Sequence, residues 1–489
     1  MSPAPPPKPH APRLRSYTMD TARPTKDYST LLQRQRDHAP ALARTTAAER
    51  KAKLDRLLTY LNDDGNKQRL LDALRQDLRK HPVETLTSEI GVLYGHVDYI
   101  KKHLARWMEP RRRATPLSMI GTRNYTYYEP KGCALILSPW NYPFNLAVVP
   151  LLYAVAAGCT VVLKPSESSP ATSDYLQRMV AELYTPEEVT VVLGEAETAA
   201  ALTQLPFDHI FFTGSPAVGK KVMAAAAANL ASVTLELGGK SPCVVDRDVD
   251  ITKSARNVCW GKFFNAGQTC TAPDYLLVHE AIAENYVAAL CRTITEFYGD
   301  DPRQSESYAR IVNRKQHDHL TELLQDGVGK GATVACGGTH DLADRYVAPT
   351  ILTDVDLDMK VMQEEIFGPI IPVLTYRTLE EALRVIHSFP KPLAFYIQAN
   401  NRKIVKRLLR ETSAGGTLVN EFFLGNANPA LPFGGVNNSG IGKSFGFHGW
   451  VDFCNERSVL ERRFLDLSSV YPPYTEKVRA LVNKIYRWS

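Results

Sequence analysis

The chain has 489 residues, of which 44% are hydrophobic, so it is long enough for two domains with separate hydrophobic cores. Its formal net charge of +6 is small for this length, and its basic residues are spread out, which argues against a nucleic-acid partner. The eight cysteines form no CxxC pair and no zinc-type spacing with histidine. We therefore expect no metal, no disulfide framework and a reducing, cytoplasmic location.

The N-terminal region carries no apolar targeting segment. Residues 1–24 are rich in proline, alanine and basic side chains, which predicts a disordered tail, and Met19 is an alternative start. From about residue 28 to residue 106, apolar residues recur at helical spacing. No apolar run approaches the roughly 20 residues that span a bilayer, so no transmembrane segment is expected.

Residues 132–238 alternate between short apolar runs and helical stretches. The five apolar runs are CALILS, TVVLKP, VTVVLG, HIFFTGS and VTLELGG. Strand and helix in repeated alternation predict an α/β fold, with a Rossmann-like parallel sheet covered by helices on both faces. Ligands of such sheets bind beyond the carboxyl ends of the strands, so the residues after each run are the candidates for function.

The segment TGSPAVGK follows the fourth run and places Gly214, Ser215 and Gly219 where a helix begins. Glycines at that point let backbone N–H groups and the positive helix end approach a phosphate. The pattern is not GxGxxG, and an ordinary turn at a helix start explains it equally well.

Lys164 and Glu167 follow the second run, where a dinucleotide-binding fold places the group that holds the adenosine ribose. A carboxylate there accepts hydrogen bonds from ribose hydroxyls and repels a 2′-phosphate. The alternative is a solvated charged loop.

Glu236 lies inside the apolar run VTLELGGK, just before two glycines. Burial would disfavour its ionised form and raise its pKa toward that of a useful proton acceptor. The alternative is an outward-facing strand residue, because Thr234, Glu236 and Gly238 share one face of the strand.

Cys270 lies in FNAGQTCTAP, among glycine, glutamine and threonine rather than in an apolar run. A thiolate is a good nucleophile even at a small ionised fraction, so modest help from neighbouring dipoles makes this cysteine a catalytic candidate. Five other cysteines lie in apolar runs and are predicted to be buried in the core: Cys133, Cys159, Cys243, Cys259 and Cys291.

Seven segments, in this order, resemble the NAD(P)-dependent aldehyde dehydrogenase superfamily: SPWNYP, KPSE, FTGSPAVGK, LELGGKSP, FNAGQTCTAP, EEIFGP and PFGGVNNSG. The forms PWNYP and PFGGVNNSG and the tail YPPYTEKV resemble its class 3, fatty-aldehyde and coniferyl-aldehyde branch.

The resemblance implies a role for each matching residue. Cys270 corresponds to the nucleophile and Glu236 to the general base, and the amide of Asn141 joins the Cys270 N–H in binding an oxyanion. Cofactor contacts are implied for Trp140, Lys164, Glu167, Gly214, Ser215, Gly219, Glu365 and Phe367.

The resemblance also implies a division of the chain. The cofactor domain would comprise 25–112 and 131–238, the catalytic domain 239–438, and a dimer-forming hairpin and C-terminal segment 113–130 and 439–489. The basic, amphipathic C-terminus TEKVRALVNKIYRWS is too short to span a bilayer, but it could lie on a membrane surface.

The expected activity is oxidation of an aldehyde to its acid with NAD, with NADP also accepted. The glutamate of LELGG favours hydrolysis of a thioester over its transfer to coenzyme A. Tyr142, Trp260 and Phe423 suggest an apolar or aromatic substrate. A cysteine-dependent esterase and a non-catalytic structural protein of the same fold are the alternatives.

Overall fold

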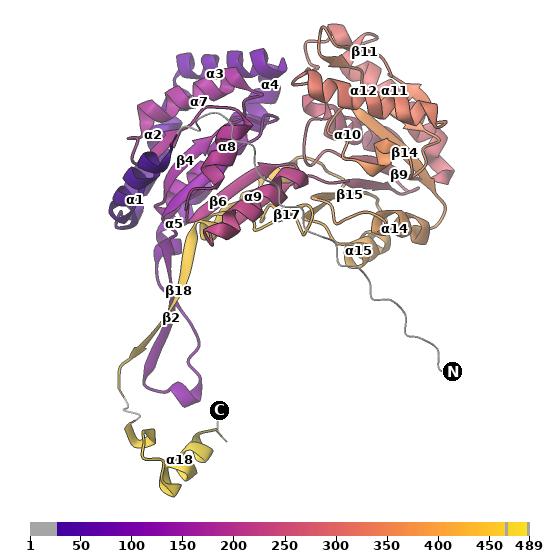
Figure 1. The fold of residues 1–489 in the computed structure, drawn as a ribbon. Coiled ribbons are helices and arrows are strands. Elements are labelled where there is room, and N and C mark those ends of the chain that lie inside the picture. Colours follow the sequence, from indigo (N-terminus) through magenta and orange to yellow (C-terminus); the bar gives the residue numbers. More distant parts are fainter. Residues whose placement is uncertain (1–26, 465–467, 487–489) are drawn as a thin grey trace, which may run out of the picture.

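A computed structural model describes residues 27–464 and 468–486. The predicted tail at 1–24 and the alternative start Met19 lie outside the described residues. Two bodies, each built on its own sheet, sit side by side, and a long arm of strands projects from the first body (Figure 1).

The first sheet has the strand order β17-β7-β6-β3-β4-β5. All neighbours are parallel except β17, which is antiparallel to β7. The five predicted apolar runs coincide with the five parallel strands, so the predicted parallel-sheet α/β fold is confirmed. The strands are β3 (Cys133–Leu137), β4 (Thr160–Lys164), β5 (Val189–Val191), β6 (His209–Gly214), β7 (Ser232–Leu237) and β17 (Gly440–Ile441).

Helices cover both faces of the first sheet, because successive side chains of each strand point to opposite faces. Ala134 and Ile136 of β3 belong to one core, whereas Leu135 and Leu137 belong to the other. The first core is covered by α2 (Ala47–Asn62), α3 (Asp64–Leu78), α5 (Val92–Met108), α6 (Asn145–Ala157) and α7 (Pro170–Leu183). The second core is covered by α1 (Ser29–Ala43), α8 (Ala196–Thr203) and α9 (Pro216–Ala228).

The second sheet has seven strands in the order β10-β13-β14-β9-β8-β15-β16 and is parallel apart from β10 at its edge. One large hydrophobic core serves it. Its strands are β8 (Pro242–Val245), β9 (Tyr275–His279), β10 (Thr333–Cys336), β13 (Thr350–Thr353), β14 (Ile370–Tyr376), β15 (Ala394–Gln398) and β16 (Gly416–Val419). The main helices of this body are α10 (Ile251–Phe263), α11 (Ala283–Tyr298), α12 (Arg314–Gly329), α14 (Leu379–His387) and α15 (Arg402–Glu411).

The chain returns to the first sheet after residue 439, within the segment expected to join protomers. Gly440 and Ile441 of β17 pair with Glu236 and Leu235 of β7. Helix α17 (Gly446–Asp452) then buries Trp450 in the core of the first body. Strand β17 and helix α17 thus extend the first sheet and fill its core. The part of the C-terminal segment that projects from the body therefore begins later, with β18.

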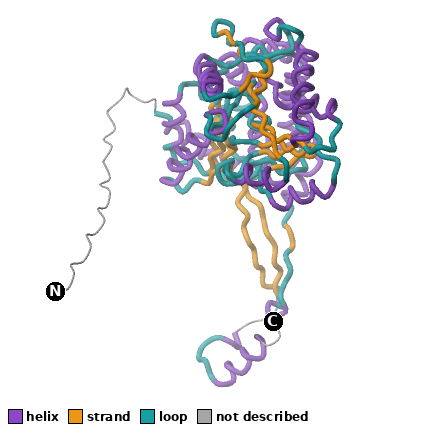
Figure 2. Tube along the Cα trace, turned by 90° about the vertical axis from the view of Figure 1, so that its right-hand side faces the viewer, coloured by secondary structure: helices purple, strands orange, loops and turns teal. Residues whose placement is uncertain are grey.

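The arm is a three-stranded antiparallel sheet of β1 (Arg111–Arg112), β2 (Thr122–Pro130) and β18 (Cys454–Arg462). Strands β2 and β18 pair along their whole length, from Thr122 opposite Arg462 to Pro130 opposite Cys454. Figure 2 shows these strands leaving the body together, with helix α18 (Glu476–Tyr486) beyond them. The segment 113–130, where a dimer-forming hairpin is expected, therefore holds strand β2, and the long partner of this strand comes from the C-terminal segment.

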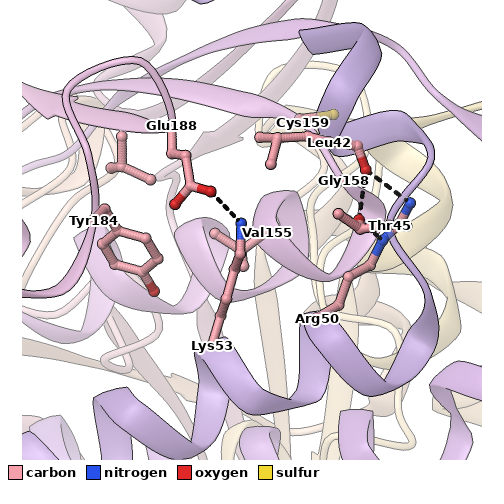
Figure 3. A pocket seen from close by; sticks show the side chains of 10 residues that line it. Leu42, Thr45, Arg50, Lys53, Val155, Gly158, Cys159, Tyr184 and Glu188 are labelled. Carbon is pink, nitrogen blue, oxygen red and sulfur yellow. Dashed lines mark hydrogen bonds and ion pairs between the residues drawn. The ribbon is translucent and has the colours of Figure 1, made fainter. Parts of the chain in front are cut away.

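A buried arginine ties the N-terminal helices to the first sheet. Arg50 of α2 is 3% exposed, and its guanidinium donates to the carbonyls of Ala156 and Ala157 at 3.0 and 2.6 Å. It also donates to the Leu42 carbonyl at 3.4 Å, at the end of α1 (Figure 3). Gly158, with φ +89°, makes room for it, because a Cβ there would lie 2.5 Å from an Arg50 nitrogen. Arg50 thus satisfies the last carbonyls of two helices.

Replacing this side chain should destabilise the first body. We expect Arg50→Ala to lower the free energy of unfolding by about 3 kcal/mol, because several buried carbonyls lose their donor. A denaturant titration followed by circular dichroism measures the loss. Arg56→Ala, at an exposed position of the same helix, is the matched control, and equal effects of the two substitutions would contradict this role of Arg50.

Candidate active site

A cleft with a volume of ≈ 790 Å³ lies at the carboxyl ends of the first-sheet strands and is bounded on the other side by loops and helix α12 of the second body. This volume is within the range of about 300 to 1,000 Å³ that small-molecule sites occupy. Eight of the predicted site residues line it: Trp140, Asn141, Gly214, Ser215, Glu236, Cys270, Glu365 and Phe367. The fold therefore brings together residues that are far apart in the chain.

Three predicted site residues do not line this cleft. Lys164 ends β4, and its Nζ donates to Glu167 at 2.6 Å, so the two residues form an ion pair. Gly219 is buried in α9, and a Cβ there would lie 2.7 Å from a Leu237 methyl group. Gly219 thus lets α9 pack closely on β7, which is a structural reason for the glycine.

The loop that carries Cys270 is held by an unusual backbone and by buried amides. Asn265 and Ala266 both adopt left-handed conformations, with φ of 53° and 51°. Gln268 is fully buried, and its Nε2 donates to the carbonyls of Asn265 and Arg310, each at 3.0 Å. The buried hydrogen bonds hold Asn265 and Ala266 in their strained conformations. The loop therefore keeps one conformation, and this fixes the position of Cys270.

Asn141 belongs to the same network. Its side-chain Nδ2 donates to the backbone carbonyl of Gln268 at 3.0 Å, and the backbone carbonyl of Asn141 accepts from Asn265 Nδ2 at 2.8 Å. Lys80, which forms a buried 2.7 Å ion pair with Glu89, also donates to the Asn141 carbonyl at 3.3 Å. The orientation of the Asn141 amide is thereby set, and its second N–H has no acceptor among the described residues.

The Cys270 thiol lies among acidic groups. Burial and, to a smaller extent, the nearby carboxylates of Glu365 and Glu236 together raise its pKa to about 12. The backbone N–H groups of Cys270 and Thr271 act in the opposite direction and favour the thiolate. Without a positive group beside it, the sulfur therefore holds its proton at neutral pH.

Glu236 is 5% exposed, which excludes the outward-facing alternative. Burial raises its pKa to about 8, against the opposing hydrogen bond from the Ser444 hydroxyl and the charge of Lys443. Ser444 donates to Oε1, while Oε2 has no partner among the described residues. One carboxylate oxygen is thus fixed and the other is left to meet a water or a substrate.

A second buried carboxylate, Glu365, lies directly against Gly238. A Cβ at Gly238 would lie 2.1 Å from the Glu365 carboxylate oxygens, so a larger residue there would displace this carboxylate. Burial, reinforced by Asp274, raises the Glu365 pKa to about 8. Lys240 forms a 2.5 Å ion pair with Asp274, and burial lowers the pKa of the nearby Lys262 to about 8.

The remaining lining suits a dinucleotide. Ser215 caps α9, where its hydroxyl accepts from the Val218 N–H at 3.4 Å, so the helix start opens into the cleft. The rings of Trp140 and Phe367 meet edge to face, with centroids 5.3 Å apart. Lys220, Lys315 and Lys391 add positive charge to the cleft wall. A helix N-terminus and lysines favour phosphate groups, and aromatic walls suit a flat ring, so the site fits NAD(P).

An aromatic cluster precedes the cysteine loop. The Phe423 ring lies 4.8 Å from Trp260 and 4.9 Å from Phe264, centroid to centroid. Trp260 is 40% exposed, which is unusual for so large an apolar side chain. Tyr142 lies elsewhere, buried, with its hydroxyl 2.7 Å from the Thr269 hydroxyl and its ring under Lys80.

The cysteine predictions hold with one exception. Cys270 is half-buried, and four of the five predicted core cysteines are buried: Cys133, Cys159, Cys243 and Cys259. The prediction for Cys291 is wrong, because this residue is half-buried on the side of α11 that faces the edge strand β10.

Several residues around the site escaped sequence reasoning. Ser444, Gln268 and Asp274 are ordinary polar residues, and only the fold brings them to Glu236, Asn141 and Lys240. The sequence did hold a signal for two residues of the site, namely their closeness to the motifs. Lys240 directly follows LELGG, and Ser444 lies four residues after PFGGVNNSG.

Comparisons with known proteins agree with this geometry. The model of the aldehyde dehydrogenase family matches residues 16–459. The chain belongs to the aldehyde dehydrogenase family. It is 43% identical over 411 residues to 4,4′-diaponeurosporen-aldehyde dehydrogenase of Staphylococcus aureus, covering 84% of this chain and 89% of that protein. It is 45% identical over 443 residues to human aldehyde dehydrogenase family 3 member B1, covering 90% of each.

The aldehyde dehydrogenase fold is also seen in solved structures. The substrate-bound state of Staphylococcus aureus AldH matches with a TM-score of 0.89 and 38% identity, covering 94% of this chain and all of that one.

The mouse dimeric NADP-preferring aldehyde dehydrogenase is 41% identical over 428 residues, which are 87% of this chain and 93% of that protein. The chain is thus an NAD(P)-dependent enzyme that oxidises an aldehyde to the acid. In the described ranges, no helix is long and apolar enough to cross a membrane.

Proposed function

We propose that this aldehyde dehydrogenase oxidises apolar aldehydes through a covalent adduct on Cys270 and hydrolyses the resulting thioester with Glu236. The observation that carries the proposal is the shared cleft: a cysteine on a fixed loop, an oriented amide and a buried carboxylate all line it. These are the nucleophile, oxyanion donor and base that acyl chemistry needs.

In the first step, the Cys270 thiol loses its proton to solvent and its sulfur attacks the aldehyde carbon, so a C–S bond forms and the C=O π bond opens to an oxyanion. The backbone N–H groups of Cys270 and Thr271 support the thiolate, against the burial and the two carboxylates that disfavour it. When bound in this cleft, where Trp140, Glu365 and Phe367 would hold it, NAD(P)⁺ would supply positive charge and the acceptor for the hydride that leaves the adduct. The second N–H of Asn141 and the Cys270 N–H hold the developing oxyanion, a contribution of about 3 to 4 kcal/mol in comparable sites.

In the second step, Glu236 accepts a proton from the water that attacks the thioester. Its unpartnered Oε2 is the atom that receives the proton. With a pKa of about 8, the carboxylate is basic enough to help and is partly ionised at neutral pH. The carboxylic acid leaves, and the enzyme is non-acylating because water rather than coenzyme A takes the acyl group.

Removing the base should separate the two steps. Glu236→Gln is expected to keep the attack by Cys270 and the hydride transfer, and to lose hydrolysis of the thioester. Stopped-flow absorbance should therefore show a burst of NADH near one equivalent per active site, followed by slow turnover. Mass spectrometry should find the acyl group on Cys270.

Cys270→Ser is the control for the burst experiment. It should give neither burst nor adduct while still binding NAD, because a hydroxyl is far less ionised than a thiol. A Glu236→Gln variant without burst or adduct would contradict the division of labour and assign Glu236 to the first step. An unchanged steady-state rate would deny Glu236 any role.

We further propose that Lys164 and Glu167 hold the adenosine ribose and favour NAD over NADP. Burial opposes ionisation of Glu167, but the hydrogen bond from Lys164, the backbone N–H of Glu167 and the charge of Lys164 together outweigh it and lower the pKa of this carboxyl. An ionised carboxylate accepts from ribose hydroxyls and repels a 2′-phosphate. Lys164 offsets part of that repulsion, so NADP is accepted as the poorer cofactor.

Neutralising this carboxylate should shift the preference. Glu167→Gln is expected to raise the ratio of kcat/KM for NADP to that for NAD roughly tenfold, equivalent to ~1.4 kcal/mol of removed repulsion. Steady-state assays with both cofactors measure the ratio. Glu197→Gln, at an exposed position of α8, is the matched control. An unchanged ratio in Glu167→Gln would place the ribose elsewhere.

The substrate class is inferred from the aromatic cluster of Trp260, Phe264 and Phe423. Phe264 begins the segment that leads to Cys270, and Trp260 exposes an apolar surface next to it. A relative is named for an aldehyde of diaponeurosporene. We therefore assign medium- or long-chain aliphatic and aromatic aldehydes, and kcat/KM values across such a panel would test the assignment.

We also propose a cytoplasmic homodimer that assembles through the arm. The arm and its tip expose apolar side chains that a monomer would leave in water: Leu117, Met119, Ile120, Leu460 and Phe464. A relative is named as dimeric. The basic helix α18 lies beyond the arm and is assigned to solvent, with contact to a membrane surface as the alternative.

A further inference from the structure

Two cysteines outside the active site lie against each other. The Sγ atoms of Cys291 in α11 and Cys336 in β10 are 2.7 Å apart. A disulfide has an S–S bond of about 2.05 Å, so a sub-ångström displacement would bring the sulfurs to bonding distance. The two residues are 45 positions apart in the chain, so the contact is made by the fold.

Both residues are partly exposed at the edge of the second body. Cys291 and Cys336 are half-buried, whereas five of the other six cysteines are buried in the cores and the sixth, Cys270, lines the cleft. Neither Cys291 nor Cys336 lines that cleft. The pair is therefore separate from the catalytic chemistry and has no role in it.

We propose that Cys291 and Cys336 are a modification site, at which a peroxide converts the two thiols into a reversible disulfide that links α11 to β10.

The two thiols are chemically unequal. The hydrogen bond from the Cys336 thiol lowers the pKa of Cys291, and the charge of Arg292 lowers it further, whereas the same bond raises the pKa of Cys336. Cys291 is thus the more easily ionised of the two thiols, and its thiolate is the form that reacts with peroxide. Cys336 keeps its proton and is the resolving thiol.

The reaction balances without any other reactant. The Cys291 sulfur attacks one peroxide oxygen and the O–O bond breaks, which leaves a sulfenic acid and, after protonation, one water from hydrogen peroxide. The Cys336 sulfur then attacks the Cys291 sulfur, the S–S bond forms and the S–O bond breaks, which releases the second water. Two electrons pass from the two sulfurs to the peroxide.

The link would strengthen a weak edge of the second body. Strand β10 is the last strand of its sheet, pairs only with β13, and has a register irregularity between Val334 and Cys336. Glycines with positive φ, Gly337 and Gly338, follow it directly. A disulfide to the long helix α11 would anchor this edge and constrain the unfolded chain.

Peptide mapping tests the proposal on the full-length chain. Reduced protein is treated with hydrogen peroxide, remaining thiols are blocked with N-ethylmaleimide, and the protein is digested without reductant. We expect the Cys291 and Cys336 peptides joined, two hydrogens lighter than their sum, and separated by dithiothreitol. Full labelling of both cysteines after peroxide, or a link from Cys291 to Cys259 instead, would overturn the proposal.

Two variants separate the roles of the thiols. Cys336→Ser should stop at a sulfenic acid on Cys291, which dimedone traps, whereas Cys243→Ser should form the link as the natural chain does. In a Cys270→Ser background, which removes the active-site thiol, peroxide should raise the melting temperature by roughly 5 °C. Adding Cys336→Ser should abolish that rise. An equal rise in melting temperature with and without Cys336→Ser would contradict the link.

Discussion

One constraint underlies the whole site: the fold buries the carboxylate of Glu236 at the end of strand β7. A charge in that place is costly, so the pKa of this group rises to about 8. The fold offsets the cost on one oxygen only, through the Ser444 hydroxyl, and leaves the other unpartnered. A buried acid with one fixed oxygen is a poor contributor to stability and a well-placed proton acceptor.

The surrounding structure serves to hold this arrangement. Strand β17 pairs Gly440 with Glu236, and the loop around it brings Ser444 to the carboxylate, so the C-terminal segment completes the base. From the other side, Gln268 and Asn265 fix the cysteine loop and orient Asn141. The reactive groups thus lie on two independently cored bodies, and the cleft between the sheets leaves room for the cofactor.

The sequence predicted what local pattern controls. The five apolar runs coincide with the five parallel strands. Because Cys270 lies in no apolar run, the sequence also distinguished it from the cysteines that are buried in the cores. Contacts between distant segments were not predictable from one sequence. Ser444 meets Glu236 across 208 positions, and Gly219 packs closely against Leu237, a contact that its place near a helix start does not reveal. Cys291 was assigned to the core because an apolar run does not reveal which helix face meets a sheet edge.

The most direct test of the central claim is to observe the protonation of Glu236 itself. Infrared difference spectra of the natural chain and Glu236→Gln, recorded across pH, isolate the C=O stretch of the protonated carboxyl group. The signal should be strong at pH 6 and disappear with a midpoint near the pKa of about 8, as the group ionises and becomes able to accept a proton. A midpoint near 4.5, the value of an ordinary glutamate, would show that burial does not tune this residue and would contradict the account.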